Sequence, residues 1–400
     1  MIAQAADFQV SEELRGAMRQ WRRRFAILGV GGLLATVAGL FAVPPNQFYR
    51  SWLWSYLFVV GLAAGSLAWL MVQYLSGGAW GVMIRRPAEA AARTLPLVVL
   101  LFIPIFIGMR NLYPWTHSSV MAADELIRQK RLYLNVPFFT IRAAIYLGGW
   151  CFLSWFFNRW SAIEDREGGP APRRKMGALA GPGLIFYGLA VTFMATDWVL
   201  SIDPHWYSTM YGLLMIAGQA LSAMAFLITV MVFLAARKPM MDVLTPRHLH
   251  DLGKLMFALV MLWAYFSFSQ FLIIWAGNLP EEIPWYLVRL RGGWEWVGLL
   301  IVIGHFALPF ALLLSRDLKR NFKLLRNVAL FVLAMRVVDI YWQVAPDFRK
   351  GTFGMSWMDL SAVLGLGGIW LASFLRQLEK RPLVPLHDPY LNEALEHGRE

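Results

Sequence analysis

The chain has 400 residues, of which 58% are hydrophobic and only 16% are charged. About 25% of the residues of a soluble domain are charged, so this chain has too few to cover a folded domain in water. Its 27 Phe and 19 Trp exclude a disordered chain. The single cysteine, Cys151, excludes an internal disulfide, a cysteine-ligated iron–sulfur cluster and a covalently attached c-type haem. The composition is that of a polytopic membrane protein.

Ten runs of mostly apolar residues have the length of about 20 residues that a helix needs to cross a bilayer. In chain order they are Phe25–Val43, Trp52–Leu75, Leu95–Leu112, Pro137–Phe157, Ala178–Leu200, Thr209–Ala235, Leu255–Ala276, Gly293–Leu314, Leu324–Ala345 and Trp357–Leu375. None has the strict alternation of a membrane β-strand, so the predicted fold is all-α. Asp203 followed by Pro204 is typical of a helix start, and predicts that the sixth span opens there.

The distribution of basic residues predicts the orientation, because loops rich in Lys and Arg stay in the cytoplasm. One side of the membrane receives 24 basic residues and the other side nine. Both termini are therefore predicted to be cytoplasmic, with residues 1–24 as an N-terminal segment, residues 25–376 as the transmembrane domain and residues 377–400 as a tail. The net charge of +12 reflects this bias, which predicts anionic membrane lipid as a partner and no nucleic acid.

A short pattern that occurs twice in the sequence indicates an internal repeat. Asp197 and Asp339 each precede a proline by seven residues, at the outer ends of the fifth and ninth spans. Because four spans separate the two aspartates, the match predicts two related four-helix bundles, at about residues 52–200 and 209–345, with the first and tenth spans flanking them. A chance match of two residues is the alternative.

Charged residues inside a membrane are costly and mark functional positions. On the predicted topology most of them lie in the outer half of their spans: Arg110, Arg142, Asp197, Glu295, Asp339 and Asp359. Arg336 and His305 lie near the midplane. The cytoplasmic half has only Lys254 and Arg326, whose long side chains reach the surface. The outer and midplane residues give these candidates for proton transfer: Asp197, Asp339, Arg336, His305, Glu295 and Asp359.

Four of these residues are predicted to form one connected site: Asp197, Asp339, Arg336 and His305. The spacing of three between Arg336 and Asp339 places them on one helix face and predicts an ion pair. That pair either holds the ninth span against its neighbours or tunes the proton affinity of Asp339. Asp197 is either part of this path or a solvated, hydrogen-bonded residue. A single histidine at membrane depth argues against haem, so His305 is either hydrogen-bonded to a neighbouring helix or a ligand.

Five segments carry a resemblance to a known family. They are Ala195–Thr209, Asp251–Phe257, Trp263–Gln270, Gly277–Glu282 and Pro385–Pro389. In these segments the chain resembles the ActF subunits of bacterial alternative complex III, which are NrfD-like membrane proteins. The resemblance covers most of residues 180–390, whereas residues 1–176 are only generally compatible with it. It implies two four-helix bundles flanked by two peripheral helices, in the bacterial inner membrane.

The resemblance also implies a function in quinol oxidation and electron transport. The chain would contribute quinone binding, proton transfer or both, with quinone or menaquinone as its ligand and no haem or iron–sulfur cluster of its own. The implied partners are a paralogous ten-helix ActC-like subunit, multihaem cytochrome c and iron–sulfur subunits, and a terminal oxidase. No catalytic residue follows from the resemblance. Two other functions are weighed against it: an ion or solute transporter, and a structural anchor for periplasmic redox subunits.

Overall fold

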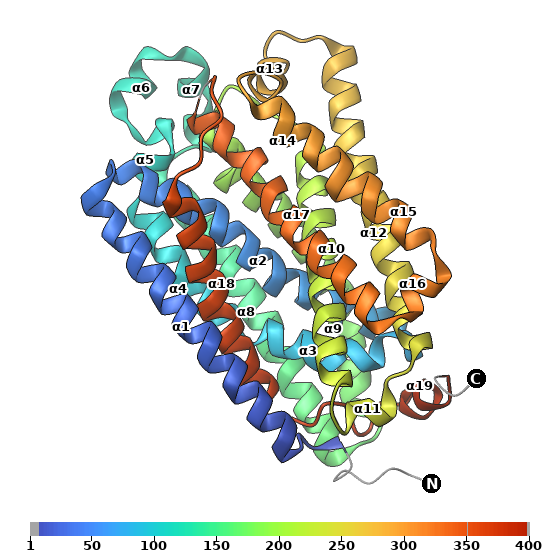
Figure 1. Ribbon diagram of the computed structural model, residues 1–400. Helices are drawn as coiled ribbons and strands as arrows, with labels where there is room; N and C mark the ends of the chain where they lie inside the picture. The colour runs from blue at the N-terminus through green and yellow to red at the C-terminus, as the bar shows by residue number, and fades with distance from the viewer. Residues whose placement is uncertain (1–7, 350, 398–400) are drawn as a thin grey trace.

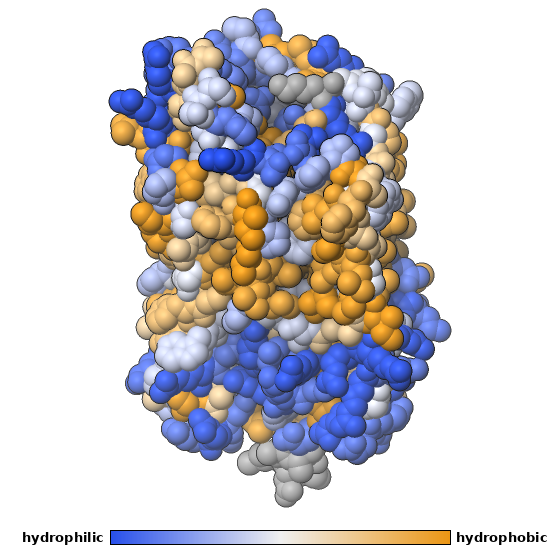
Figure 2. Space-filling view, turned by 90° about the vertical axis from the view of Figure 1, so that its left-hand side faces the viewer, coloured by the Kyte–Doolittle hydropathy of each residue, from blue (hydrophilic) through white to orange (hydrophobic). Residues whose placement is uncertain are grey.

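The computed structural model describes residues 8–349 and 351–397, and all regular elements in this part of the chain are helices. Nine of them are long and apolar enough to cross a membrane. They are α1 (Glu12–Ala42), α2 (Pro45–Ser76), α8 (Val136–Glu167), α9 (Pro170–Trp198), α10 (Tyr211–Ala235), α12 (Pro246–Gly277), the α14–α15 segment (Trp294–Leu314), α17 (Phe322–Phe348) and α18 (Trp357–Leu378). Figure 2 shows a wide hydrophobic band between two hydrophilic ends. The predicted all-helical class is confirmed, and the length and hydropathy of these helices are compatible with a multi-pass membrane protein.

The third predicted span, Leu95–Leu112, is not one straight helix. Its main part, α4 (Leu95–Ile107), meets the helical segment Ala79–Ala92 at a bend of 41°, and only the two together amount to a tenth crossing. Pro96 explains the break. It has no backbone N–H, so it cannot donate the hydrogen bond to the carbonyl of Ala92 that one continuous helix would need. The first part of the bent pair contains α3 (Val82–Ala92), which runs across the bundle (Figure 1), and all residues of α3 are buried.

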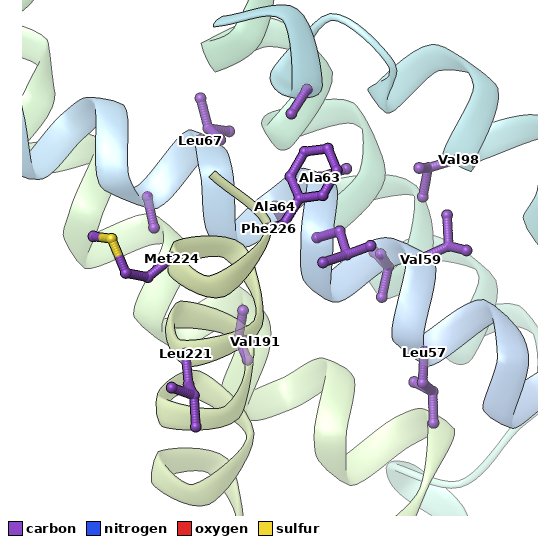
Figure 3. Packing of buried hydrophobic residues seen from close by; sticks show 14 of the residues in the cluster. Leu57, Val59, Ala63, Ala64, Leu67, Val98, Val191, Leu221, Met224 and Phe226 are labelled. Carbon is purple, nitrogen blue, oxygen red and sulfur yellow. The ribbon is translucent and has the colours of Figure 1, made fainter. Parts of the chain in front are cut away.

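Helices α2 and α10 form the centre of the molecule. Most of each is buried, and both also pack against α9 and α17. Small residues bring the two backbones together: a side-chain carbon added at Gly65 would lie 2.5 Å from the backbone oxygen of Gln219. Figure 3 shows apolar side chains of both helices around this line, among them Ala64 and Leu67 on α2 and Met224 and Phe226 on α10. Close packing of small residues stabilises helix pairs in lipid, where the hydrophobic effect between helices is absent.

Helix α1 lies along α18 at one edge of the bundle (Figure 1). The start of α1 and the C-terminal helix α19 (Leu391–His397) lie at the same end of the molecule, where the backbone N–H of Leu383 donates to the oxygen of Phe8 at 3.0 Å. We call this the terminal end and the opposite one the distal end. The two described ends of the chain are therefore on one side of the hydrophobic band.

The connections are short helices and turns. They include α5 (Met109–Leu112), α6 (Ser118–Ala123), α7 (Glu125–Gln129), α11 (Met240–Val243), α13 (Pro284–Arg289) and α16 (Arg316–Arg320). The prediction that Asp203 and Pro204 open the sixth span is wrong, because α10 begins at Tyr211. Asp203 instead accepts the backbone N–H of His205 at 3.2 Å, so its side chain closes a local turn, an alternative that aspartate favours as much as a helix cap.

Candidate functional site

Asp339 and Arg336 form an ion pair on α17, as their spacing predicts, and each side chain is 2% exposed. Two further groups hold the carboxylate. The indole N–H of Trp263 on α12 donates to it at 3.1 Å, and the amide of Gln343, one turn further along α17, donates at 2.9 Å. A buried charge needs such partners, since an unpaired carboxylate in a low-dielectric interior is very costly.

His305 packs against Trp263. Their rings meet edge to face with centroids 4.3 Å apart, and His305 is fully buried. Neither of its ring nitrogens has a hydrogen-bond partner among the described residues. The predicted hydrogen bond to a neighbouring helix is therefore not seen. The residue lies in a π-helical turn (Val302–Ala307) between α14 (Trp294–Ile301) and α15 (Leu308–Leu314), and such turns are frequent at functional sites.

Asp339 lines a cavity of about 490 Å³ between α12, α13, α14 and α17. We call it the Asp339 cavity. Apolar and aromatic side chains form most of its wall: Leu214, Trp263, Phe268, Phe271, Trp285, Leu299, Val302, Phe306 and Trp342. Phe268 is 62% exposed and Val302 is 57% exposed, so the cavity opens on the apolar flank of the molecule. Its size and its few polar groups are typical of a site for a small organic ligand.

Gln270 and Tyr286 add polar groups to the wall of the Asp339 cavity. The amide of Gln270 donates to the phenol oxygen of Tyr286 at 3.4 Å, and Gln270 also accepts from the hydroxyl of Ser208, which lies outside the cavity wall, at 3.2 Å. Glu295, one of the predicted proton-transfer residues, also lines the cavity but accepts the backbone N–H of Gly293 at 2.8 Å. Glu295 therefore binds the backbone at the start of α14, and it lines the same cavity as Asp339.

Asp197 lies in a separate ion pair. Arg142 on α8 binds it through two hydrogen bonds of 2.8 Å, and the hydroxyl of Tyr146 donates to it at 2.8 Å. The guanidinium also lies over the rings of Tyr133 and Phe138. Within residues 8–349 and 351–397, no hydrogen bond or ion pair links this group to Asp339. The residues predicted as one connected site therefore form two separate buried groups, in which each aspartate pairs with a different arginine.

We expect Asp197→Ala to lower the stability of the folded chain by about 3 kcal/mol, because the change leaves the Arg142 guanidinium buried without its counter-ion. The thermal unfolding midpoint in detergent measures the loss. Asp203→Ala is the control, since Asp203 is 38% exposed and its loss removes only a local turn contact, so it should lower the midpoint far less. Replacing the pair together, Asp197→Leu with Arg142→Met, should recover most of the loss. An Asp197→Ala variant as stable as the Asp203 control would contradict the assignment.

Asp359, the remaining predicted proton-transfer residue, links α18 to α2 through hydrogen bonds. It caps its own helix by accepting the backbone N–H of Ser356 at 2.8 Å. Three side chains of α2 also donate to it: Ser51 at 2.6 Å, Gln47 at 3.0 Å and Trp54 at 3.3 Å. The side chain is 2% exposed. These four donors stabilise its buried carboxylate. Asp359 does not line the Asp339 cavity.

The largest buried group of charges was not predicted. It lies at the terminal end, around α3, and we call it the α3 charge cluster: Arg85, Arg86, Glu89, Glu164, Asp165 and Asp388, with Arg173 and Arg381 at its edge. Glu89 is fully buried and accepts from both α3 arginines, from Ser161 at 2.6 Å and from Tyr74 at 3.3 Å. Arg85 and Arg86 were counted among the basic residues of a loop on the cytoplasmic side, whereas the structure buries both of them.

The distal end carries an open polar basin of about 680 Å³, lined by Arg110, His117, Asp124 and His205 among others. Asp124 accepts the backbone N–H of Ile127, which lowers the pKa of its carboxyl, and the contact with His205 at 2.7 Å acts in the same direction. Across residues 8–349 and 351–397, no three His, Cys, Asp or Glu side chains are arranged to hold a metal ion.

No protein-family profile matches the chain, and no curated protein matches its sequence.

Proposed function

We propose that the chain is an integral membrane subunit of a quinol:electron-acceptor oxidoreductase and that the Asp339 cavity binds the quinol headgroup. The observation that carries the proposal is the cavity itself: about 490 Å³ of mainly aromatic wall, open on the apolar flank, with a carboxylate at its inner side. A quinol has a flat ring with two hydroxyl groups and a long apolar tail. The ring fits between aromatic walls, and an opening in the hydrophobic band leaves the tail in lipid.

The polar groups of the cavity suit the chemistry of quinol oxidation. The reaction releases two electrons and two protons as the two hydroxyls become carbonyls. Asp339 would accept a hydrogen bond, and then a proton, from one hydroxyl, while Arg336 and Trp263 keep its carboxylate oriented. The electrons would pass to redox centres in partner subunits, since the resemblance places none in this chain.

The proposed arrangement in the membrane follows from the same resemblance. Helices α2 to α9 form one four-helix bundle and α10 to α17 a second, with α1 and α18 flanking them. The packing supports this, since α2 contacts α9 and α17 just as α10 contacts α17 and α9. With both termini in the cytoplasm, the distal end faces the periplasm. The paralogous, cytochrome and iron–sulfur partners would then lie beside the bundle and over the distal basin.

We expect Asp339→Asn to lower quinol oxidation by the intact complex about 100-fold, because the amide cannot accept a proton. Steady-state turnover with a soluble quinol measures the effect. Asp359→Asn is the matched control: it removes a charge that is equally buried but lies outside the cavity, so it should change stability and leave turnover per folded complex within about two-fold.

A second variant separates catalysis from folding. Leu299 is on the open side of the cavity and 46% exposed, so Leu299→Trp should fill the cavity without disturbing the ion pair. Its expected effect is a raised KM for quinol at an unchanged unfolding temperature. If both variants turn over normally, the chain is a structural anchor for the redox subunits. Solute uptake by the purified chain in proteoliposomes would instead favour a transporter.

A further inference from the structure

A second apolar cavity, of about 540 Å³, lies between α9 and α10 at the distal end. We call it the α9–α10 cleft. Its lining is mainly apolar and includes Phe193, which is 44% exposed, and Leu132, which is 83% exposed. Lys130, Ser208 and Thr209 are among its polar lining residues, which we call its polar rim. The cleft therefore combines exposed apolar side chains with a small set of polar groups that includes one cation.

Lys130 is the charged group of this rim. Its ammonium donates to the backbone oxygen of Pro204 at 2.5 Å and lies 5.8 Å from the ring centroid of Tyr207. In the described part of the chain, Lys130 has no carboxylate within ion-pair distance. Burial lowers the pKa of Lys130, against the opposing effect of Asp203 and Asp124. The ammonium has thus lost part of its hydration and keeps N–H groups for a further acceptor.

We infer that the α9–α10 cleft is a binding site for a membrane phospholipid, with the phosphodiester at Lys130 and an acyl chain along Phe193. A phosphodiester supplies the counter-ion that the ammonium lacks, and an acyl chain covers the apolar wall. A neutral quinone would meet only the second requirement, and a free phosphate only the first. Cations at the edge of the hydrophobic band attract anionic lipid headgroups. The site is distinct from the Asp339 cavity and does not rest on the proposed function.

The test uses the full-length chain, purified in detergent, stripped of lipid and titrated with phosphatidylglycerol in mixed micelles. Binding is measured as the rise of the thermal unfolding midpoint. We expect Lys130→Gln to raise the half-saturating lipid concentration roughly five-fold. Arg131→Gln is the matched control, because this neighbouring cation does not line the cleft, and it should behave as the unchanged chain. Equal responses from the two variants would overturn the inference.

Two further measurements keep the inference falsifiable. Inorganic phosphate alone should give no stabilisation; an equal rise with phosphate would mean a free anion site and would overturn the lipid assignment. A phosphatidylglycerol with a photoreactive acyl chain should label peptides of α9 that contain Phe193, and the label should fall in Lys130→Gln at limiting lipid. Labelling spread evenly over the lipid-facing helices, without preference for α9, would show ordinary bilayer contact and would also overturn it.

Discussion

Replacing Glu89 by alanine is expected to abolish accumulation of the folded chain. Glu89 is fully buried and neutralises two arginines of its own helix, Arg85 and Arg86, while Arg381 contacts it at 3.4 Å. Removing one partner of a buried ion pair costs about 3–5 kcal/mol, and here the same carboxylate serves three cations. Whole proteins are stable by only about 5–15 kcal/mol, so one such loss is a large fraction of the total.

The measurement is the fraction of monodisperse protein on size-exclusion chromatography after expression in membranes. Glu89→Gln keeps the shape and the acceptor oxygen, so it should be less damaging than alanine. Glu167→Ala is the control, since Glu167 is exposed on α8 one turn beyond Glu164. A Glu89→Ala protein that elutes like the Glu167 control would show that the α3 charge cluster contributes little to folding.

Gly365→Leu is expected to detach α1 from α18. The two helices meet through glycines: a side-chain carbon at Gly32 would lie 2.5 Å from the backbone nitrogen of Gly365, and one at Gly368 would lie 2.6 Å from that of Gly29. Overpacking a helix contact costs about 1–3 kcal/mol. The full cost falls on the contact between α1 and α18, because α1 has few contacts with other helices.

The hydrogen bond of 2.8 Å between Thr36 and Ser361 provides the readout. With both residues changed to cysteine and Cys151 changed to serine, oxidation should link the helices, and Gly365→Leu should reduce the linkage about ten-fold. Gly367→Leu is the matched control, because a side chain at Gly367 meets no atom within 4 Å. Undiminished linkage in Gly365→Leu would show that the glycine contact does not hold α1.

The helices could be predicted from the sequence because hydropathy and helical spacing are local properties. The apolar runs place nine long helices, and the spacing of three between Arg336 and Asp339 gives their ion pair. The third span shows where this reasoning ends. Its hydropathy gave one helix, but Pro96 breaks the backbone ladder, and the segment before it is buried although it carries Arg85 and Glu89.

The sites could not be predicted as fully, because their parts come from distant segments. Arg142 and Asp197 were both recognised as buried charges, but their pairing depends on how α8 packs on α9. Arg85 was counted as a loop cation, since its partners Glu164 and Asp388 lie 79 and 303 residues further along. The Asp339 cavity has walls from several helices, so no stretch of sequence contains its pattern.

The contact between Arg85 and Asp388 has a consequence for the order of synthesis. The ribosome makes Arg85 first, and the carboxylate that binds it at 2.6 Å is made 303 residues later. A nascent chain that stops after α18 has every long helix, yet its buried guanidinium lacks one counter-ion. The charges buried around α3 are therefore balanced only after Asp388 has been made. A product truncated before Asp388 would keep this charge unbalanced, and quality-control proteases would meet it as an unstable chain.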